Sequence, residues 1–306
     1  DKFGVASIDE ALILRSIGIT KSIVLMEGVF DYAELAIAAG QDFELVLHNQ
    51  EQANWLMQAT TNCPSCIWIK IDTGMGRLGF TVQEGDAIYT KIAQSNCGIA
   101  NLGIMSHFSM AENQSAPTTQ AQKQVCMQLM ERYQGPCSFV NSAGIFAFKK
   151  LHGNVVRPGI ALYGISPFAN MVGADLGLKP VMTLKSHLIA VKMLQKGHAV
   201  GYTASYICPE TMPVGIVAIG YGDGYPRCAT NGTPFLIKNV LCPLIGKVSM
   251  DMLAVDLRPL TVNASIGDEV LIWGNQLPVE KVAQHTNTIA YELLTRVQQR
   301  VVFKWI

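Results

Sequence analysis

The chain has 306 residues, of which 49% are hydrophobic and 15% charged, and its 23 basic and 23 acidic side chains balance to a net charge of zero. This composition is typical of a globular protein, and the missing basic surplus argues against a nucleic-acid-binding surface. Its apolar stretches are strand-sized and interrupted by charge, so we expect no membrane-spanning segment.

From the first residues to about residue 165, strand-like apolar runs alternate with helix-like segments. The helix-like segments open with acidic or polar residues and several end at glycine, which are helix start and stop signals. This alternation predicts parallel strands joined by crossover helices. The predicted strands lie at 3–7, 22–28, 43–49, 65–72, 99–108, 137–142 and 154–164, and the predicted helices at 8–18, 30–40, 50–60, 82–94, 118–133 and 143–150.

Seven such strands are one fewer than an eight-stranded β/α barrel needs. We therefore expect a (β/α)8 TIM-type barrel whose first βα unit is absent from residues 1–306. Without that unit the barrel cannot close, so these residues expressed alone should be insoluble or bind no cofactor, because a sheet edge is exposed. A doubly wound sheet is the alternative, but no GxGxxG follows the first strand.

The fourth predicted strand carries a lysine within an apolar run. Ile67, Ile69 and Ile71 alternate with Trp68 and Lys70, which is the period of two that a strand requires. A strand this apolar should be covered on both faces, where an unpaired ammonium is costly. Lys70 therefore needs a chemical explanation.

The eight cysteines are dispersed and several lie in apolar surroundings, which fits reduced thiols and a cytoplasmic location. Cys63-Pro-Ser-Cys66 has the spacing of a redox or zinc motif, but no second cysteine pair or histidine pair completes a zinc site. We therefore expect core and turn cysteines and no metal site.

After about residue 175 the sequence becomes rich in β-branched residues, with alternating segments separated by Gly, Pro and Asn turns. This sequence pattern predicts a second domain that is mostly β. We expect the domains at residues 1–175 and 176–306, with short helices at 277–286 and 289–297.

Catalytic groups of β/α barrels lie at the carboxyl ends of the strands. At those ends stand Glu27, His48, Asn49, Lys70, Asp72, Arg77, His107, Asn141, Ser142 and Arg157. Two histidines and two arginines at one mouth suit an anion. The backbone N–H groups of Gly159 and Ile160, with the hydroxyl of Ser142, suit a phosphate.

Eight motifs follow one another along the chain: KIDTGMGRLGF, MSHFSMAE, NSAGIF, VRPGIALYG, VGYTASY, GIVAIGYGDGYPR, GKVSMDMLAVDL and AYELLTRV. In order and spacing they resemble the bacterial alanine racemases (fold type III) over essentially the whole chain. The resemblance implies a barrel that binds pyridoxal 5′-phosphate (PLP), a β domain, and a head-to-tail homodimer with shared active sites. It also implies interconversion of L-alanine and D-alanine, for peptidoglycan synthesis or for alanine catabolism.

The family carries its cofactor lysine at the end of the first barrel strand, in a motif resembling V-x-K-A-N-A-Y-G-H-G. Residues 1–306 contain no such stretch. The unit that we expect to be absent is the one that carries this motif, so we assign no lysine of this chain to that role.

The resemblance assigns the catalytic roles residue by residue. Tyr202 matches one of the two bases, and because a phenol with a pKa near 10 is a weak base, it needs tuning. His107 and Arg157 match the positively polarised groups that provide it. Arg157 also matches the residue that faces the pyridine nitrogen, and since arginine can only donate, that nitrogen stays largely unprotonated and transamination is disfavoured.

The remaining matched positions bind cofactor and substrate. Those of the phosphate cradle are Ser142, Gly159, Ile160 and Tyr291. Arg77 and the Met250 backbone N–H match the contacts to the substrate carboxylate. Tyr221 and Tyr291 match a narrow entrance that admits a substrate of about the size of alanine.

Lys70 matches a lysine that the family carries as a carbamate. Arg77 lies seven residues on, across a Gly-Met-Gly turn, and like charges close together in a dry site favour the neutral amine, which reacts with carbon dioxide. The resulting carbamate could orient the guanidinium of Arg77. The alternative is that Asp72, on the same strand face, pairs directly with Lys70.

Three competing functions remain open. An amino-acid decarboxylase would need a cysteine–acid pair, whereas Ser249 stands at the corresponding place. A broad-specificity amino-acid racemase differs only in pocket size. A non-catalytic PLP-binding homologue would lack the β domain that carries Tyr202 and Met250.

Overall fold

The computed structural model describes residues 1–59, 63–95 and 98–306. It divides into two compact units, Asp1–Pro158 and Gly159–Ile306, each of which is described by itself below. The predicted domain boundary at residue 175 stays a prediction. Within the described residues, no helix is both long and apolar enough to cross a membrane.

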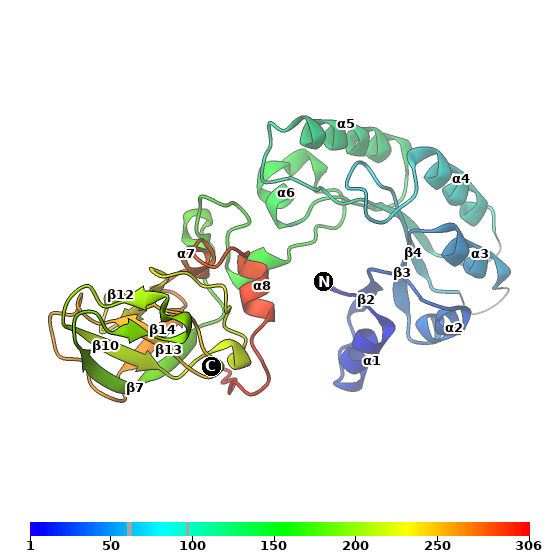
Figure 1. The fold of residues 1–306 in the computed structure, drawn as a ribbon. Helices are drawn as coiled ribbons and strands as arrows, with labels where there is room; N and C mark the ends of the chain where they lie inside the picture. Colours follow the sequence, from blue (N-terminus) through cyan, green and yellow to red (C-terminus); the bar gives the residue numbers. More distant parts are fainter. Residues whose placement is uncertain (60–62, 96–97) are drawn as a thin grey trace. The chain divides into compact units, whose positions relative to one another are not determined.

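The first unit is a parallel half-barrel in which each strand pairs with the next one along the chain. Its strands are β1 (Lys2–Val5), β2 (Ser22–Leu25), β3 (Phe43–Leu47), β4 (Cys66–Lys70), β5 (Asn101–Met105) and β6 (Cys137–Ser138). Its helices are α1 (Ile8–Ser16), α2 (Tyr32–Gly40), α3 (Gln50–Gln58), α4 (Val82–Ala93), α5 (Pro117–Arg132) and α6 (Ser142–Ala147). Helices α2 to α5 follow the outer side of the curved sheet (Figure 1). The predicted alternating β/α architecture is confirmed.

Side-chain caps fix where several helices begin. The Asp31 side chain accepts a hydrogen bond from the backbone N–H of Glu34 at the start of α2, and α4 opens with a reciprocal capping box between Thr81 and Glu84. Such caps satisfy N–H groups that have no partner inside the helix. The βα loops before α2 and α4 therefore have defined ends, which fix the residues that follow β2 and β4.

The predicted strand at residues 154–164 is wrong. Its pairing is limited to one parallel bridge between Asn141 and Arg157, and Ile160–Tyr163 forms a 3₁₀ turn, η2. Pro158 lacks a backbone N–H and so cannot extend the ladder past Arg157. The single bridge is nevertheless enough to bring Arg157 beside the loop that follows β6.

The second unit is built on a closed antiparallel barrel with the strand order β10-β13-β12-β11-β14-β7. Its strands are β7 (Leu184–Leu194), β10 (Met212–Val217), β11 (Pro234–Ile237), β12 (Val240–Ile245), β13 (Leu253–Asp256) and β14 (Glu269–Trp273), with the small hairpin β8 (Ala199–Val200) and β9 (Tyr206–Ile207). Two short helices, α7 (Val279–Ala283) and α8 (Ala290–Thr295), follow the last strand (Figure 1). The mostly β character of this part of the chain is confirmed.

Three aromatic side chains pack together within the largely aliphatic core of the second unit. Phe235, Tyr225 and Trp273 are buried, and the Tyr225 ring lies 5.6 Å from that of Phe235 and 6.4 Å from that of Trp273, between ring centroids. Aromatic pairs at such separations add to the free energy gained by burial. This core gives the loops at the barrel ends a rigid base.

The described cysteines are free thiols: Cys63, Cys66, Cys126, Cys137, Cys208, Cys228 and Cys242. Cys97 lies outside the described residues. Within residues 1–59, 63–95 and 98–306, no three His, Cys, Asp or Glu side chains form a group that could hold a metal ion.

Candidate active site

A small pocket opens where β4 and β5 end in the first unit. Its lining consists of Lys70, Ile71, Asp72, Met75, Arg77, Leu78, Ser106 and His107. Four of the polar residues predicted at the strand ends, namely Lys70, Asp72, Arg77 and His107, therefore meet at one place. Lys70, Arg77 and His107 bring N–H groups to this place, so the pocket offers hydrogen-bond donors to an anion.

Lys70 is the last residue of β4 and is only 6% exposed. Burial lowers the pKa of its ammonium to about 8, and the nearby charges of Arg157 and Arg77 act in the same direction. A larger share of Lys70 is therefore neutral near pH 8 than in a solvent-exposed lysine. Its surroundings suit a neutral amine or an anionic derivative better than an ammonium.

Asp72 shapes the turn that presents Arg77. Its Oδ1 accepts hydrogen bonds from the backbone N–H groups of Gly74 and Met75 at 2.9 and 2.8 Å, and its Oδ2 from that of Gly76 at 2.9 Å. Burial alone would raise the pKa of this carboxyl, but the backbone donors outweigh it and lower the pKa. No ion pair joins Asp72 to Lys70, both of which the structure describes, so the direct-pair alternative fails because Asp72 is engaged by the turn.

Arg157 is held by backbone carbonyls from two strand ends. One terminal nitrogen donates to the Ser138 carbonyl at 2.8 Å, and the other donates to the Ser106 carbonyl at 2.5 Å. Burial lowers the pKa of the guanidinium to about 10, so it stays protonated at neutral pH. The site thus contains one permanently charged, rigidly oriented donor.

His107 lies against this guanidinium. A terminal nitrogen of Arg157 is 3.3 Å from His107 Nδ1, and because arginine only donates, Nδ1 accepts and the ring proton is on Nε2. Burial, together with the charges of Arg157, Arg77 and Lys70, lowers the pKa of His107 to about 4. The imidazole is therefore neutral at physiological pH, and it is a polarised neighbour of Arg157 rather than a second cation.

Gln122 of α5 is a site residue that the sequence did not reveal. It is fully buried, and its Nε2 donates to the Thr73 hydroxyl at 3.2 Å and to the His107 carbonyl at 3.0 Å. Its Oε1 accepts from the backbone and hydroxyl of Ser109, both at 3.0 Å. One amide therefore ties together the loop that leads to Arg77 and the loop that carries His107.

Other predicted residues form separate groups. His48 Nε2 lies 2.9 Å from the Glu27 carbonyl, and Gln52 donates to the same carbonyl at 3.0 Å, away from the Lys70 pocket lining. Asn141 caps α6, whose first residue is the buried Ser142. The Asn141 amide nitrogen also donates to the Phe108 carbonyl at 3.3 Å, which connects this helix start to the loop that carries His107.

In the second unit, two pairs of predicted residues lie close together. The backbone N–H of Tyr221 donates to the Ser249 carbonyl at 3.0 Å, and that of Gly222 donates to the Met250 carbonyl at 2.8 Å. The loops of Tyr221 and Met250 therefore run side by side. A Cβ atom at Gly220 would be 2.3 Å from that carbonyl, so this approach requires glycine. At the start of η2, a Cβ atom at Gly159 would be 3.9 Å from the ring of Tyr291.

Tyr202 lies on the turn that connects β8 to β9 and is 63% exposed. A Cβ atom at the preceding Gly201 would be 3.4 Å from the backbone nitrogen of Lys247, three residues before Met250. The tyrosine is therefore largely exposed on the second unit, near the segment that leads to Met250.

Comparison with known proteins identifies relatives of the whole chain. Residues 1–167 match the family described as "Alanine racemase, N-terminal domain", and residues 181–305 match "Alanine racemase, C-terminal domain". The alanine racemase of Coxiella burnetii is 45% identical over 306 residues, which cover 98% of this chain and 84% of that protein.

Two solved structures are similar over the same extent. The biosynthetic alanine racemase of Pseudomonas aeruginosa matches with a TM-score of 0.94 and 38% identity, covering 98% of this chain and 84% of that one. The alanine racemase of Bartonella henselae, solved with covalently bound pyridoxal phosphate, matches with a TM-score of 0.84 and 28% identity, covering 98% and 83%.

Proposed function

Because the chain belongs to the alanine racemase family, we propose that it interconverts L-alanine and D-alanine with Tyr202 as the proton-transferring group on one face of the substrate. The observation that carries this proposal is the pocket beside β4 and β5, where Arg77 is available for a carboxylate next to the fixed pair of Arg157 and His107. Racemisation requires that the Cα proton leave on one face and return on the other. The second base of the family is the lysine that binds the cofactor.

The family uses PLP, and the residues of this chain fit that group. Arg157 is a half-buried guanidinium that donates in a fixed direction, as a partner of a pyridine nitrogen must if it is to leave that nitrogen unprotonated. The phosphate would be held by Ser142, Gly159, Ile160 and Tyr291. When bound, PLP supplies the electron sink for the bond that breaks at Cα.

The side chains of this protein then orient the substrate and move its proton. Arg77 and the Met250 backbone N–H would bind the carboxylate, which leaves the Cα–H bond facing a base. The Tyr202 hydroxyl would take or return that proton, aided by His107 and Arg157. Tyr221 and Tyr291 would restrict the entrance to side chains of about the size of a methyl group.

We also propose a cytoplasmic head-to-tail homodimer in which Tyr202 and Met250 of one subunit serve the pocket of the other. The exposure of the Tyr202 side chain supports this arrangement, because it is free to reach another subunit. The product D-alanine would supply peptidoglycan synthesis, or the enzyme would serve alanine catabolism.

Optical activity separates the candidate functions. The native enzyme with PLP should abolish the circular dichroism of L-alanine and of D-alanine at comparable rates and act far more slowly on serine or larger amino acids. Rapid loss of signal from many amino acids would indicate a broad-specificity racemase. An unchanged signal for alanine would indicate a PLP-binding homologue without this activity and would reject the proposal.

Tyr291→Ala should weaken PLP binding and widen the entrance, because the variant removes both the phenol near Gly159 and the bulk of the ring. The ratio of serine to alanine racemisation should rise about tenfold, in line with the 1–3 kcal/mol that one steric contact contributes to specificity. Ile266→Ala, at an exposed position, is the control. An unchanged substrate ratio would show that Tyr291 does not form the entrance.

Gln122→Met should raise the KM for alanine about tenfold while changing kcat less, because the loop before Arg77 loses its tie and Arg77 chiefly binds the carboxylate. Gln128→Met, at an exposed position of the same helix, is the matched control. Equal KM values in both variants would mean that Gln122 does not position the site.

A further inference from the structure

The turn that carries Tyr202 has an unfavourable backbone. Thr203 and Ala204 have φ values of 59° and 50°, in the left-handed region that residues with a Cβ atom rarely adopt and that is especially costly for a β-branched threonine. Residues 201–205 are all exposed, so no core packing holds them in this shape. Strained turns of this kind persist only where the surrounding structure fixes both ends.

The end before Tyr202 is fixed by burial. Val200 is 6% exposed and belongs to an apolar cluster with Cys208, Met212 and Val214, and the backbone N–H of Cys208 donates to the His198 carbonyl at 2.8 Å. These contacts hold the base of the β8–β9 hairpin. On the side of the turn that follows Ala204, Tyr206 pairs with Val200 across the hairpin and packs against the same cluster.

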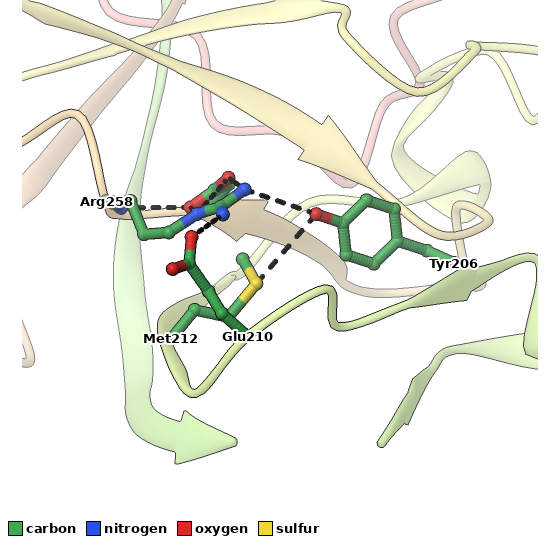
Figure 2. A network of polar contacts seen from close by, with 5 residues as sticks. Tyr206, Glu210, Met212 and Arg258 are labelled. Carbon is green, nitrogen blue, oxygen red and sulfur yellow. Dashed lines mark hydrogen bonds and ion pairs between the residues drawn. The ribbon is translucent and has the colours of Figure 1, made fainter. Parts of the chain in front are cut away.

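Tyr206 is held through Arg258, as Figure 2 shows. Arg258 donates to both oxygens of the buried Asp256 through Nε at 3.1 and 3.0 Å, and a terminal nitrogen donates to one of them at 2.6 Å. The same guanidinium lies 3.5 Å from the Tyr206 hydroxyl and forms an ion pair with Glu210. The Tyr206 hydroxyl in turn lies 3.8 Å from Met212 Sδ.

One guanidinium thus connects the end of β13 to two points of the segment that follows the turn, Tyr206 and Glu210. We propose that Arg258 is a positioning residue for Tyr202: fixed by Asp256, it anchors the 206–210 segment and so holds the strained turn in the conformation that aims the phenol. This inference rests on the proposed role of Tyr202 in proton transfer. A planar guanidinium suits this role because its N–H groups contact several acceptors at once in a fixed geometry, which a lysine ammonium does not provide.

The test uses two variants. Arg258→Met removes all these donors, and Tyr206→Phe removes only the hydroxyl that the guanidinium approaches. If Arg258→Met fails to fold, Tyr206→Phe alone tests the positioning role. Lys185→Met is the control, since Lys185 pairs with Glu269 at 3.0 Å on the surface of the same barrel. Amide hydrogen exchange of the peptide 199–208 should be faster in both test variants and unchanged in the control. The peptide covering β7 should exchange as in the parent protein.

The second readout is exchange of the α-hydrogen of alanine with solvent deuterium. For one enantiomer, the one whose proton Tyr202 removes, the rate should fall on the order of ten- to a hundredfold in Arg258→Met, as expected for a misplaced catalytic group. The rate for the other enantiomer should change less than twofold. Arg258→Lys should restore part of the loss.

Equal loss for both enantiomers, or no change in amide exchange at 199–208, would overturn the positioning role. If Tyr202→Phe itself left the two enantiomers equal, the proposed function of Tyr202 would fail instead. The amide-exchange result would still report on the anchoring by Arg258.

Discussion

Tyr202→Phe is expected to lower alanine racemisation by roughly three orders of magnitude, within the range of a positioned general acid–base group. The substitution keeps the ring and removes the only atom that can carry the proton. PLP binding should persist, because Tyr202 is not among the residues proposed to hold the cofactor. Exchange of the α-hydrogen with solvent deuterium should become strongly unequal for the two enantiomers of alanine, as measured by NMR.

The matched control for this variant is Tyr32→Phe, because Tyr32 is 49% exposed on α2 and has no proposed role. It should retain the parent rate for both enantiomers. Equal residual exchange rates in Tyr202→Phe, close to those of the parent, would mean that Tyr202 is not a base.

Lys70→Ala is expected to reduce kcat/KM for alanine on the order of a hundredfold, because Arg77 loses the group that orients it. We propose that Lys70 acts as a carbamate: its neutral amine adds to carbon dioxide, forming an N–C bond and releasing one proton to solvent. The product carries a negative charge, which the nearby charges of Arg157 and Arg77 favour, since both lower the pKa of the lysine. Acetate or chloride should restore part of the activity of the variant.

The control for this experiment is Lys91→Ala, at an exposed position of α4. It should keep full activity and show no response to added anions. Full activity of Lys70→Ala without any added anion would contradict the carbamate.

The carbamate also predicts a pH dependence. The pKa of Lys70 is lowered to about 8, so the reactive neutral amine increases as the pH rises through that value and is replaced by the ammonium below it. With ¹³C-labelled bicarbonate, the carbamate NMR signal should therefore be weak at pH 6 and strong at pH 9. A signal that is independent of pH, or that persists in Lys70→Ala, would assign it to another amine.

The strand carrying Lys70 could be predicted because the period-two pattern and the apolar flanks are local. The same local logic failed at residues 154–164, where apolar residues suggested a strand but Pro158 limits the pairing to one bridge at Arg157. The proline was visible in the sequence. The neighbouring strand β6 has only two residues, which the sequence did not show, and the observed bridge joins Arg157 to Asn141 beyond the end of that strand.

The groups that support the site could not be predicted, since their partners are distant in sequence or lie on the backbone. Arg157 is anchored by the carbonyls of Ser106 and Ser138, which any residue type would provide. The sequence contained one indication of the role of Gln122. This residue lies on the buried face of α5 with Thr119, Cys126 and Leu129, where a polar side chain needs hydrogen-bond partners. The contact between Arg258 and Tyr206 joins residues that are 52 positions apart in the sequence and has no local signature.

The central claim is that the proton leaves and returns through different groups, one of them Tyr202. It is tested most directly by converting L-alanine in deuterium oxide with the native enzyme and measuring the deuterium at Cα of the D-alanine formed at low conversion. Two bases on opposite faces predict that nearly every product molecule carries deuterium, because the group that returns the proton is not the one that removed it. Product that retains the original hydrogen in most molecules would contradict this, since a single group would then have carried the proton from one face to the other.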